Sequence, residues 1–344
     1  APKLQLEEIS GSLKRVMPES IFVPSFSDWT DFFEFMFFVS RMKPFALFID
    51  EFHLFSEFRG SSVSPFKKLW EKHKAEGRLH LFAITYDKGF LIDKFGAKAS
   101  PYYNMVDSYI PVEAFSLEEV VKLCKENSSS LKIKQILELY AVFGGLPKYY
   151  YLIDAYKLWN KKVSKIIEML VLERFAPLGR EHQEIIHGEL NRGNRIYIGI
   201  LQAIALGHQT MTDIAQFIDV PVTHMGKYLN ELDKKKELIK RVQPYGFKSK
   251  VHSKFGKYEF CNPFDNFWFR FIHPYIGDFE NGKTEKITET LEQSFDTYME
   301  ERVKILLQEI FESNSANRLT HDLLEGDVSA ISSLWNRKEH IDLL

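Results

Sequence analysis

From about residue 21 to residue 86, the chain alternates between helical and strand-like patterns of apolar positions. Apolar residues recur at helical spacing over residues 29–42 and 64–76, and short continuous apolar runs follow at 44–49 and 79–84. Continuous runs are typical of strands in parallel sheets, which are linked by crossover helices. The pattern therefore predicts an α/β layer with two fully buried strands and with any chemistry at their carboxyl ends.

The pattern becomes helical over residues 116–190. Ser116, with Glu119 three positions later, has the signature of a capping box that starts a helix. The segment 144–147, with the sequence Gly-Gly-Leu-Pro, interrupts the helical run before another helix begins. We expect a small helical lid domain in this region.

A third pattern begins near residue 195. Three helical segments lie within residues 195–236, with a turn at 219–222 between the second and the third. Two strand-like runs follow at 238–242 and 257–260, joined through a Pro-Tyr-Gly turn. This order and spacing are typical of a winged helix, in which a helix-turn-helix is followed by a β-hairpin.

The last part of the chain has an aromatic-rich segment, a long helical stretch and two short strand-like runs. No repeat of 20–50 residues is visible. The patterns together divide the chain into four predicted regions. These are an α/β core at 1–115, a helical lid at 116–190, a winged helix at 191–262, and a linker with a mixed tail at 263–344.

Composition narrows the class of protein. The chain has 344 residues with 45% hydrophobic and 27% charged content, which is enough for more than one folded domain. Two cysteines exclude a disulfide framework and a four-cysteine zinc site, and suit a reducing cytoplasm. No apolar run is long enough to cross a membrane. Because the sequence begins with Ala1 and stops abruptly at Leu344, we expect a fragment.

Charge is distributed unevenly along the sequence. The formal net charge is −2, but residues 223–257 hold ten Lys and Arg against three acids, a net of +7. The rest of the chain, with 35 basic and 44 acidic residues, therefore carries −9. A basic module in an acidic chain is compatible with binding to the phosphates of nucleic acid.

The clearest local motif is an apolar run that ends in two adjacent acids, Asp50 and Glu51. At the end of a strand, the first carboxylate can help to hold Mg²⁺ and the second can orient an attacking water beside a phosphate. Thr85 follows the next strand-like run, where a polar group could contact the phosphate or the water. The alternative interpretation is a strand that simply meets a solvated acidic turn.

Three segments extend this observation: residues 47–53, residues 144–149, and the Asn-Pro-Phe and Trp-Phe-Arg-Phe stretch at 262–271. Their order and spacing, with the winged-helix region between the last two, resemble the archaeal-type P-loop ATPase family of the AAA+/STAND clade. The resemblance covers most of the chain. Its most specific parts are the Gly-Gly-Leu-Pro and the Trp-Phe-Arg-Phe segments.

The resemblance implies a parallel-sheet P-loop ATPase core with ATP or ADP and Mg²⁺ as cofactors. It implies that Asp50 and Glu51 are the Walker B acids, with Asp50 on the metal and Glu51 on the water, and that Thr85 is a sensor residue. It also implies that Gly145 and Pro147 lie in the lid near the adenine.

Two features depart from the family pattern. The phosphate loop Gly-x-x-x-x-Gly-Lys-Ser/Thr is absent from the sequence, although the family places it before the acidic strand. We expect a missing N-terminal segment rather than a degenerate relative. The stretch 101–105 also lacks the arginine that family members often carry after the sensor strand, which puts an arginine finger here in doubt.

The resemblance implies a PD-(D/E)xK nuclease-like tail. Asp342 would be its first metal-binding acid, and Glu300 or Glu301 would be an accessory ligand. The D/E-x-K pair that completes such a metal site is absent and would have to follow Leu344. The tail as printed is therefore not expected to cleave nucleic acid.

The predicted third helix and wing supply candidate contacts to double-stranded DNA. The candidates are Thr223, His224, Lys227 and Tyr228 on the helix, and Lys248, Lys250 and Lys254 on the wing. The alternative is that this module docks on the nucleotide domain or on a partner.

The leading hypothesis is a cytoplasmic Mg-ATP switch that couples nucleotide state to a DNA-binding winged helix and a nuclease-like tail. A competing hypothesis is a DNA-binding or partner-binding protein with a vestigial ATPase fold and no activity. A metal-dependent nuclease is the third. Each of these hypotheses is compatible with a homo-oligomer.

Overall fold

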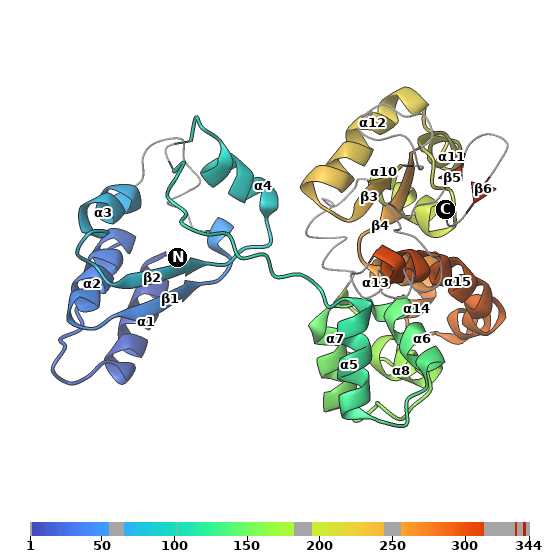
Figure 1. Cartoon of the computed structure of the whole chain (residues 1–344), viewed down its shortest axis with the longest axis horizontal. Helices are drawn as coiled ribbons and strands as arrows, with labels where there is room; N and C mark the ends of the chain where they lie inside the picture. The colour runs from blue at the N-terminus through green and yellow to red at the C-terminus, as the bar shows by residue number, and fades with distance from the viewer. Residues whose placement is uncertain are drawn as a thin grey trace, which may run out of the picture. The chain divides into compact units, whose positions relative to one another are not determined.

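The computed structural model divides the chain into two compact units, Ala1–Pro111 and Val112–Leu344 (Figure 1). Each unit has its own cluster of buried apolar side chains. The described residues are 2–54, 65–100, 102–181, 195–243, 256–312, 334–335 and 340–341.

The first unit combines helices with one pair of parallel strands. Helix α3 lies in the connection between β1 and β2, so these three elements form a βαβ crossover. The elements of the unit are α1 (Pro2–Val16), α2 (Trp29–Met42), β1 (Phe45–Ile49), η1 (Phe52–Leu54), α3 (Pro65–His73), β2 (Leu79–Ala83), α4 (Lys88–Leu91) and η3 (Ile92–Gly96).

Helix α2 supplies much of the first core. Its start is capped by Asp28, whose side chain accepts a hydrogen bond from the backbone N–H of Asp31 at 3.0 Å. Phenylalanines along its length are buried, and the ring of Phe33 packs edge-on against Phe66 of α3 with 4.6 Å between centroids. The predicted helix over residues 29–42 is confirmed, and its aromatic side chains are used for packing.

The β1–β2 sheet has one covered and one exposed face. Leu47 pairs with Leu81, and both side chains pack on the core. Phe48 and Phe82 lie on the opposite face, 62% and 36% exposed, with their rings stacked at 4.6 Å. The prediction of two fully buried strands is therefore wrong for the described part of this unit. Helix α2 packs against β2 on one side, and an apolar run cannot tell which of its faces a neighbour will cover.

The second unit begins with a helical part and ends with a long helix and a small hairpin. The helical part contains α5 (Leu117–Asn127), α6 (Ile133–Phe143), α7 (Pro147–Ala155), α8 (Val163–Ile167) and η4 (Glu168–Leu172). The final part contains α13 (Pro263–Phe267), η7 (Trp268–Ile272), η8 (His273–Tyr275), α14 (Ile276–Glu280), α15 (Glu285–Glu312), β5 (Leu334–Trp335) and β6 (His340–Ile341).

The aromatic-rich segment forms the centre of the second core. Phe264 of α13 stacks on Phe143 of α6 at 5.6 Å and also contacts the ring of Tyr149, with all three side chains fully buried. Phe271 of η7 packs edge-on against Tyr298 of α15 at 5.3 Å. These contacts join α6, α13, η7 and α15 into one packed body.

Between these parts lies a three-helix segment followed by a hairpin. Its elements are α10 (Arg195–Ala205), α11 (Met211–Phe217), α12 (Val222–Asn230), η6 (Glu231–Lys235), β3 (Ile239–Val242) and β4 (Lys257–Phe260). Strands β3 and β4 are antiparallel. Thr210, just before α11, bridges to Lys257, and the N–H of Tyr258 donates to the carbonyl of Gln209 at 2.8 Å. Three extended segments therefore lie side by side.

The fold is mixed α/β and mostly helical, with three two-stranded sheets in the part of the chain that the structure describes. Only β1–β2 among them is parallel. In the tail, the described strands β5 and β6 pair Leu334 with Ile341.

Candidate functional site

The segments that follow the two parallel strands lie side by side at the same edge of the sheet. The ladder continues past the strands, because the N–H of Ile84 donates to the carbonyl of Ile49 and the N–H of Phe52 donates to the carbonyl of Ile84, both at 2.8 Å. The predicted acidic pair is therefore held next to Thr85. This is the position where open parallel sheets bind ligands.

The acidic pair forms a tight turn. The N–H of Glu51 donates to Asp50 Oδ1 at 2.9 Å, and Glu51 adopts a left-handed backbone with φ of 49°. Both acids are exposed, whereas the next residue, Phe52, is only 2% exposed and anchors the turn in the core. A left-handed backbone is uncommon for a residue other than glycine, and such residues occur disproportionately at functional sites.

His53 connects this turn with Thr85. Its Nδ1 lies 3.0 Å from Thr85 Oγ1 and 3.3 Å from Glu51 Oε2. The His53 side chain is 12% exposed, compared with 47% for Glu51. The sequence predicted Glu51 and Thr85 as site residues but gave His53 no role. The available signal was its position two residues after the acidic pair.

Thr85 is fixed from its other side as well. Its Oγ1 accepts a hydrogen bond from the N–H of Asp87 at 3.0 Å, and Asp87 Oδ1 accepts one from the N–H of Phe90 at 2.8 Å. These bonds join the end of β2 to the start of α4. The Thr85 hydroxyl therefore occupies a defined position rather than rotating freely in solvent.

Asp50 offers a ligand of the kind that Mg²⁺ prefers. Mg²⁺ usually keeps several waters and takes one or two protein carboxylates together with phosphate oxygens. The exposed carboxylate of Asp50 fits that donor set. No group of three or more His, Cys, Asp or Glu in the described residues could hold a metal ion by itself.

Gly145 and Pro147 lie in the second unit, and both have clear roles in packing. A Cβ on Gly145 would lie 1.8 Å from the carbonyl oxygen of Phe115, whose N–H donates to the Gly145 carbonyl at 2.8 Å. Gly144 ends α6 with a φ of 62° and packs against Pro263. Pro147 occupies the first turn of α7, where its missing N–H is harmless.

A polar contact next to this loop had no counterpart in the sequence analysis. The buried hydroxyl of Tyr149 donates to Glu181 Oε1 at 2.9 Å, and Lys148 Nζ bonds the same oxygen. Burial, then the neighbouring Glu181 carboxylate, raise the pKa of Tyr149. Tyr149 and Glu181 are 32 residues apart in the chain, so no local pattern could have paired them.

Helix α12 presents its predicted DNA-contacting residues on one exposed side. Thr223, His224 and Lys227 are exposed, while Met225 and Leu229 are fully buried in the core of the unit. Tyr228 is half-buried, and its ring packs edge-on against Tyr197 of α10 at 5.2 Å. The first three side chains are therefore available to a partner, whereas Tyr228 also helps to hold the helix in place.

Some of the remaining predicted site residues lie in the part of the chain that the structure describes, and others lie outside it. Lys248, Lys250, Lys254 and Asp342 lie outside the described residues. Glu300 is exposed on α15, and its neighbour Glu301 lies 3.5 Å from Arg270 in an ion pair.

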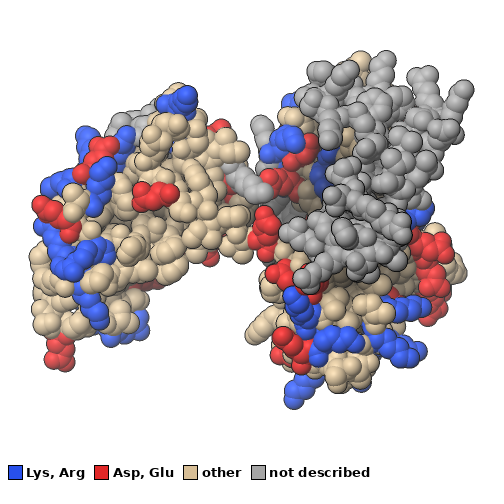
Figure 2. Space-filling view, in the orientation of Figure 1, with Lys and Arg blue, Asp and Glu red and all other residues tan. Residues whose placement is uncertain are grey.

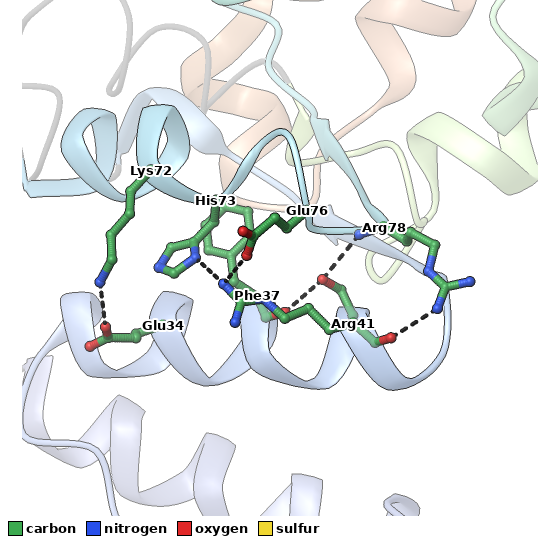
Figure 3. Close-up of polar contacts among 8 residues, drawn as sticks. Glu34, Phe37, Arg41, Lys72, His73, Glu76 and Arg78 are labelled. Carbon is green, nitrogen blue, oxygen red and sulfur yellow. Dashed lines mark hydrogen bonds and ion pairs between the residues drawn. The ribbon is translucent and has the colours of Figure 1, made fainter.

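A second polar cluster in the first unit ties the end of α2 to the end of α3 (Figure 3). Arg41 Nη2 lies 2.8 Å from His73 Nδ1 and 2.9 Å from Glu76 Oε2. Because arginine can only donate, His73 Nδ1 accepts, and the ring carries its proton on Nε2. Burial, reinforced by Lys72 and Arg41, lowers the pKa of His73, whose ring stacks on Phe37. These bonds join the end of α2 to the end of α3.

The described surface of the second unit carries charges of both signs. Over the helices of the second unit, Lys and Arg are interspersed with Asp and Glu on the face that Figure 2 shows. Among the described residues, every helix is too short or too polar to cross a lipid bilayer.

The chain is similar to archaeal and bacterial proteins. Residues 268–344 match the family DUF234, described as archaeal and bacterial proteins of unknown function. Over 324 residues, or 92% of the chain, the sequence is 24% identical to Uncharacterized protein MJECL04 of Methanocaldococcus jannaschii. The match covers 66% of that relative, so the chain spans about two thirds of its length. No solved structure matches the chain.

Proposed function

We propose that the chain belongs to an Mg²⁺-dependent ATPase of the AAA+/STAND type and carries the acidic half of its catalytic site. The observation that carries this proposal is the line of contacts from Glu51 through His53 to Thr85, at the carboxyl ends of adjacent parallel strands. A mostly covered histidine that joins the acidic turn to the neighbouring strand supports a function for this turn.

Each residue has a role in this proposal. Asp50 would hold Mg²⁺ together with phosphate oxygens, Glu51 would orient the attacking water, and Thr85 would bond the γ-phosphate or that water. Gly145 and Pro147 would shape the lid loop through the backbone rather than through side chains. The phosphates would be bound by a Gly-rich loop, which the printed sequence does not contain.

The proposal is tested on the complete protein with the variant Glu51→Gln, which keeps the size of the side chain and removes its charge. We expect kcat for ATP hydrolysis to fall about 100-fold or more, because positioned general bases contribute at least that much. The Kd for Mg-ATP should change by less than about threefold, because the lost interaction acts in the transition state.

The matched control is Glu71→Gln on α3 of the same unit. Glu71 forms its ion pair with Lys67 within α3 at 3.5 Å, so hydrolysis should be unchanged. Normal hydrolysis by Glu51→Gln, or no hydrolysis by the unaltered complete protein, would refute the proposal.

DNA binding without catalysis is a second candidate function, and a specific observation favours it. The chain would bind duplex DNA through a winged helix made of α10, α11, α12 and the β3–β4 hairpin. Thr223, His224 and Lys227 are exposed on α12 while the opposite side of that helix is anchored in the core. The nuclease-like tail would then be a passive neighbour.

This second candidate is tested by titrating duplex DNA at several salt concentrations. Binding through phosphates requires affinity to fall as salt rises, with a slope of about −0.9 per phosphate contact. Lys227→Glu, and separately the triple change of Lys248, Lys250 and Lys254 to Glu, should weaken binding and flatten the slope. Lys165→Glu on α8 is the control, because Lys165 pairs with Glu168 within its own helical segment. Equal affinity of all four proteins would exclude the proposed interface.

A further inference from the structure

We infer that His53 is a positioning residue that makes the Thr85 hydroxyl a hydrogen-bond donor toward a bound phosphate oxygen or the attacking water. This inference rests on the ATPase function proposed above and deepens it. It assigns a role to a side chain that neither the acidic motif nor the sensor position includes. Whether His53 Nδ1 carries a proton determines whether the Thr85 hydroxyl can donate to a ligand.

The hydrogen-bond capacity of Thr85 is the first step. A threonine hydroxyl has one proton to donate and two lone pairs that accept. One lone pair of Thr85 Oγ1 accepts the N–H of Asp87 at 3.0 Å. His53 Nδ1, at 3.0 Å, takes up either the second lone pair or the proton of the hydroxyl. The tautomer of His53 therefore determines what Thr85 can offer to a ligand.

Glu51 selects between the two arrangements. Its Oε2 lies 3.3 Å from the same Nδ1. A carboxylate oxygen is an acceptor, so it favours a proton on Nδ1 and is repelled by a lone pair there. The Nδ1–H form can be shared between Glu51 Oε2 and Thr85 Oγ1. Both lone pairs of Thr85 are then occupied, and its own proton must go elsewhere.

The two tautomers of His53 leave the Thr85 hydroxyl with different groups to offer to a ligand. With a proton on His53 Nδ1, the Thr85 hydroxyl can satisfy its donor only on an acceptor brought by the ligand, such as a phosphate oxygen or a water. With the proton on Nε2 instead, Thr85 would donate to the ring and would present only a lone pair, which repels an anionic oxygen. The geometry therefore ties the donor that a phosphate needs to the charge on Glu51.

The ring of His53 is well placed to hold this arrangement. It packs edge-on against Tyr86, with 4.8 Å between ring centroids, and against Phe90 at 6.4 Å. With 12% of its side chain exposed, it exchanges few of its bonds with water. A packed ring fixes its nitrogen more accurately than an exposed one, which a positioning role requires.

The kinetic test uses substitutions that imitate one ring nitrogen each. In His53→Asn the side-chain amide comes close to the position of Nδ1, and in His53→Gln it reaches toward that of Nε2. We expect His53→Asn to keep kcat for ATP hydrolysis within about threefold and His53→Gln to lose about 10–100-fold, the usual effect of an orienting partner. The Kd for Mg-ATP should be the same in both.

A double substitution separates positioning from a purely structural role. If His53 acts through Thr85, then Thr85→Val should lose as much kcat as His53→Gln, and the combined variant should lose no more than either. Multiplied losses in the combined variant would overturn the inference. So would equal kcat in His53→Asn and His53→Gln.

A second measurement needs no activity and uses the chain as printed. The ¹⁵N shifts of a histidine ring report which nitrogen carries the proton, and the signals of His53 are those that vanish in His53→Asn. We expect a proton on His53 Nδ1 in the unaltered chain. In Glu51→Gln, a smaller fraction of His53 should carry its proton on Nδ1. A ring protonated on Nε2 alone would overturn the inference even if the protein hydrolyses ATP. Absence of hydrolysis in the complete wild-type protein would instead contradict the ATPase proposal.

Discussion

Replacing Gly145 with alanine should disrupt the second unit, because the new methyl group would overlap the backbone of Phe115. The new Cβ would lie 1.8, 2.7 and 2.8 Å from the carbonyl oxygen, carbonyl carbon and nitrogen of Phe115. Real Cβ contacts below 3.0 Å essentially never occur, so the two segments must separate by more than an ångström. No flexible side chain can move aside, because all three atoms belong to the backbone.

The magnitude follows from what that separation breaks. The N–H of Phe115 donates to the Gly145 carbonyl at 2.8 Å, and losing such a bond costs about 1 kcal/mol. Overpacking in a well-packed region costs typically about 1–3 kcal/mol more. We therefore expect the free energy of unfolding of the second unit to fall by roughly 2–4 kcal/mol.

The assay is a urea titration of the full chain, with hydrogen exchange of peptides from α6 and α7 to assign the transition to the second unit. Gly226→Ala is the matched control. Gly226 lies inside α12, and apart from its chain neighbours and the backbone of its own helix no described atom lies within 4 Å of the position that an alanine methyl group would take. Alanine should therefore stabilise the helix by about 0.5–1 kcal/mol.

A loss below about 1 kcal/mol in Gly145→Ala, with normal exchange in α6 and α7, would refute the steric reasoning. It would leave the Gly-Gly-Leu-Pro loop free for the nucleotide contact that the family resemblance implies. The expected large loss would instead mean that reduced nucleotide binding by this variant is no sign of direct contact.

Two further outcomes are expected. Burial lowers the pKa of His73 from its ordinary value of 6.5. The neutral ring therefore contributes its full stability to the first unit above about pH 6.5. This contribution is lost as pH falls through the lowered pKa of His73. The urea midpoint of that unit should drop on acidification, and less so in His73→Phe; equal slopes would contradict this. Thr210→Ala removes the cap of α11, where Thr210 Oγ1 accepts from the N–H of Asp213 at 3.2 Å. Urea titration should give a loss of about 1 kcal/mol, with Thr210→Ser close to wild type.

Local patterns were enough to locate the main elements. The predicted helix over residues 29–42 coincides with α2, and the predicted runs at 44–49 and 79–84 lie within one residue of β1 and β2. Periodicity and capping are properties of neighbouring residues, so the sequence contains them directly. The coverage of the sheet was not accessible in this way, because a neighbour far along the chain decides it.

The candidate site was only partly predictable for the same reason. Asp50, Glu51 and Thr85 were recognised because each follows an apolar run. The role of His53 depends on a contact with Thr85, 32 residues further along the chain. That contact exists only because the parallel register of β1 and β2 brings the two turns together.

The sequence by itself determined most of the helices and strands, where charge accumulates and which acids end an apolar strand. These follow from residue types within one or two turns of each other. The tertiary structure alone decided that Phe48 stays exposed, that Gly145 must lack a side chain, and that one histidine nitrogen faces both Glu51 and Thr85. Each of these depends on atoms that are distant in the chain and meet only after packing has fixed their distances.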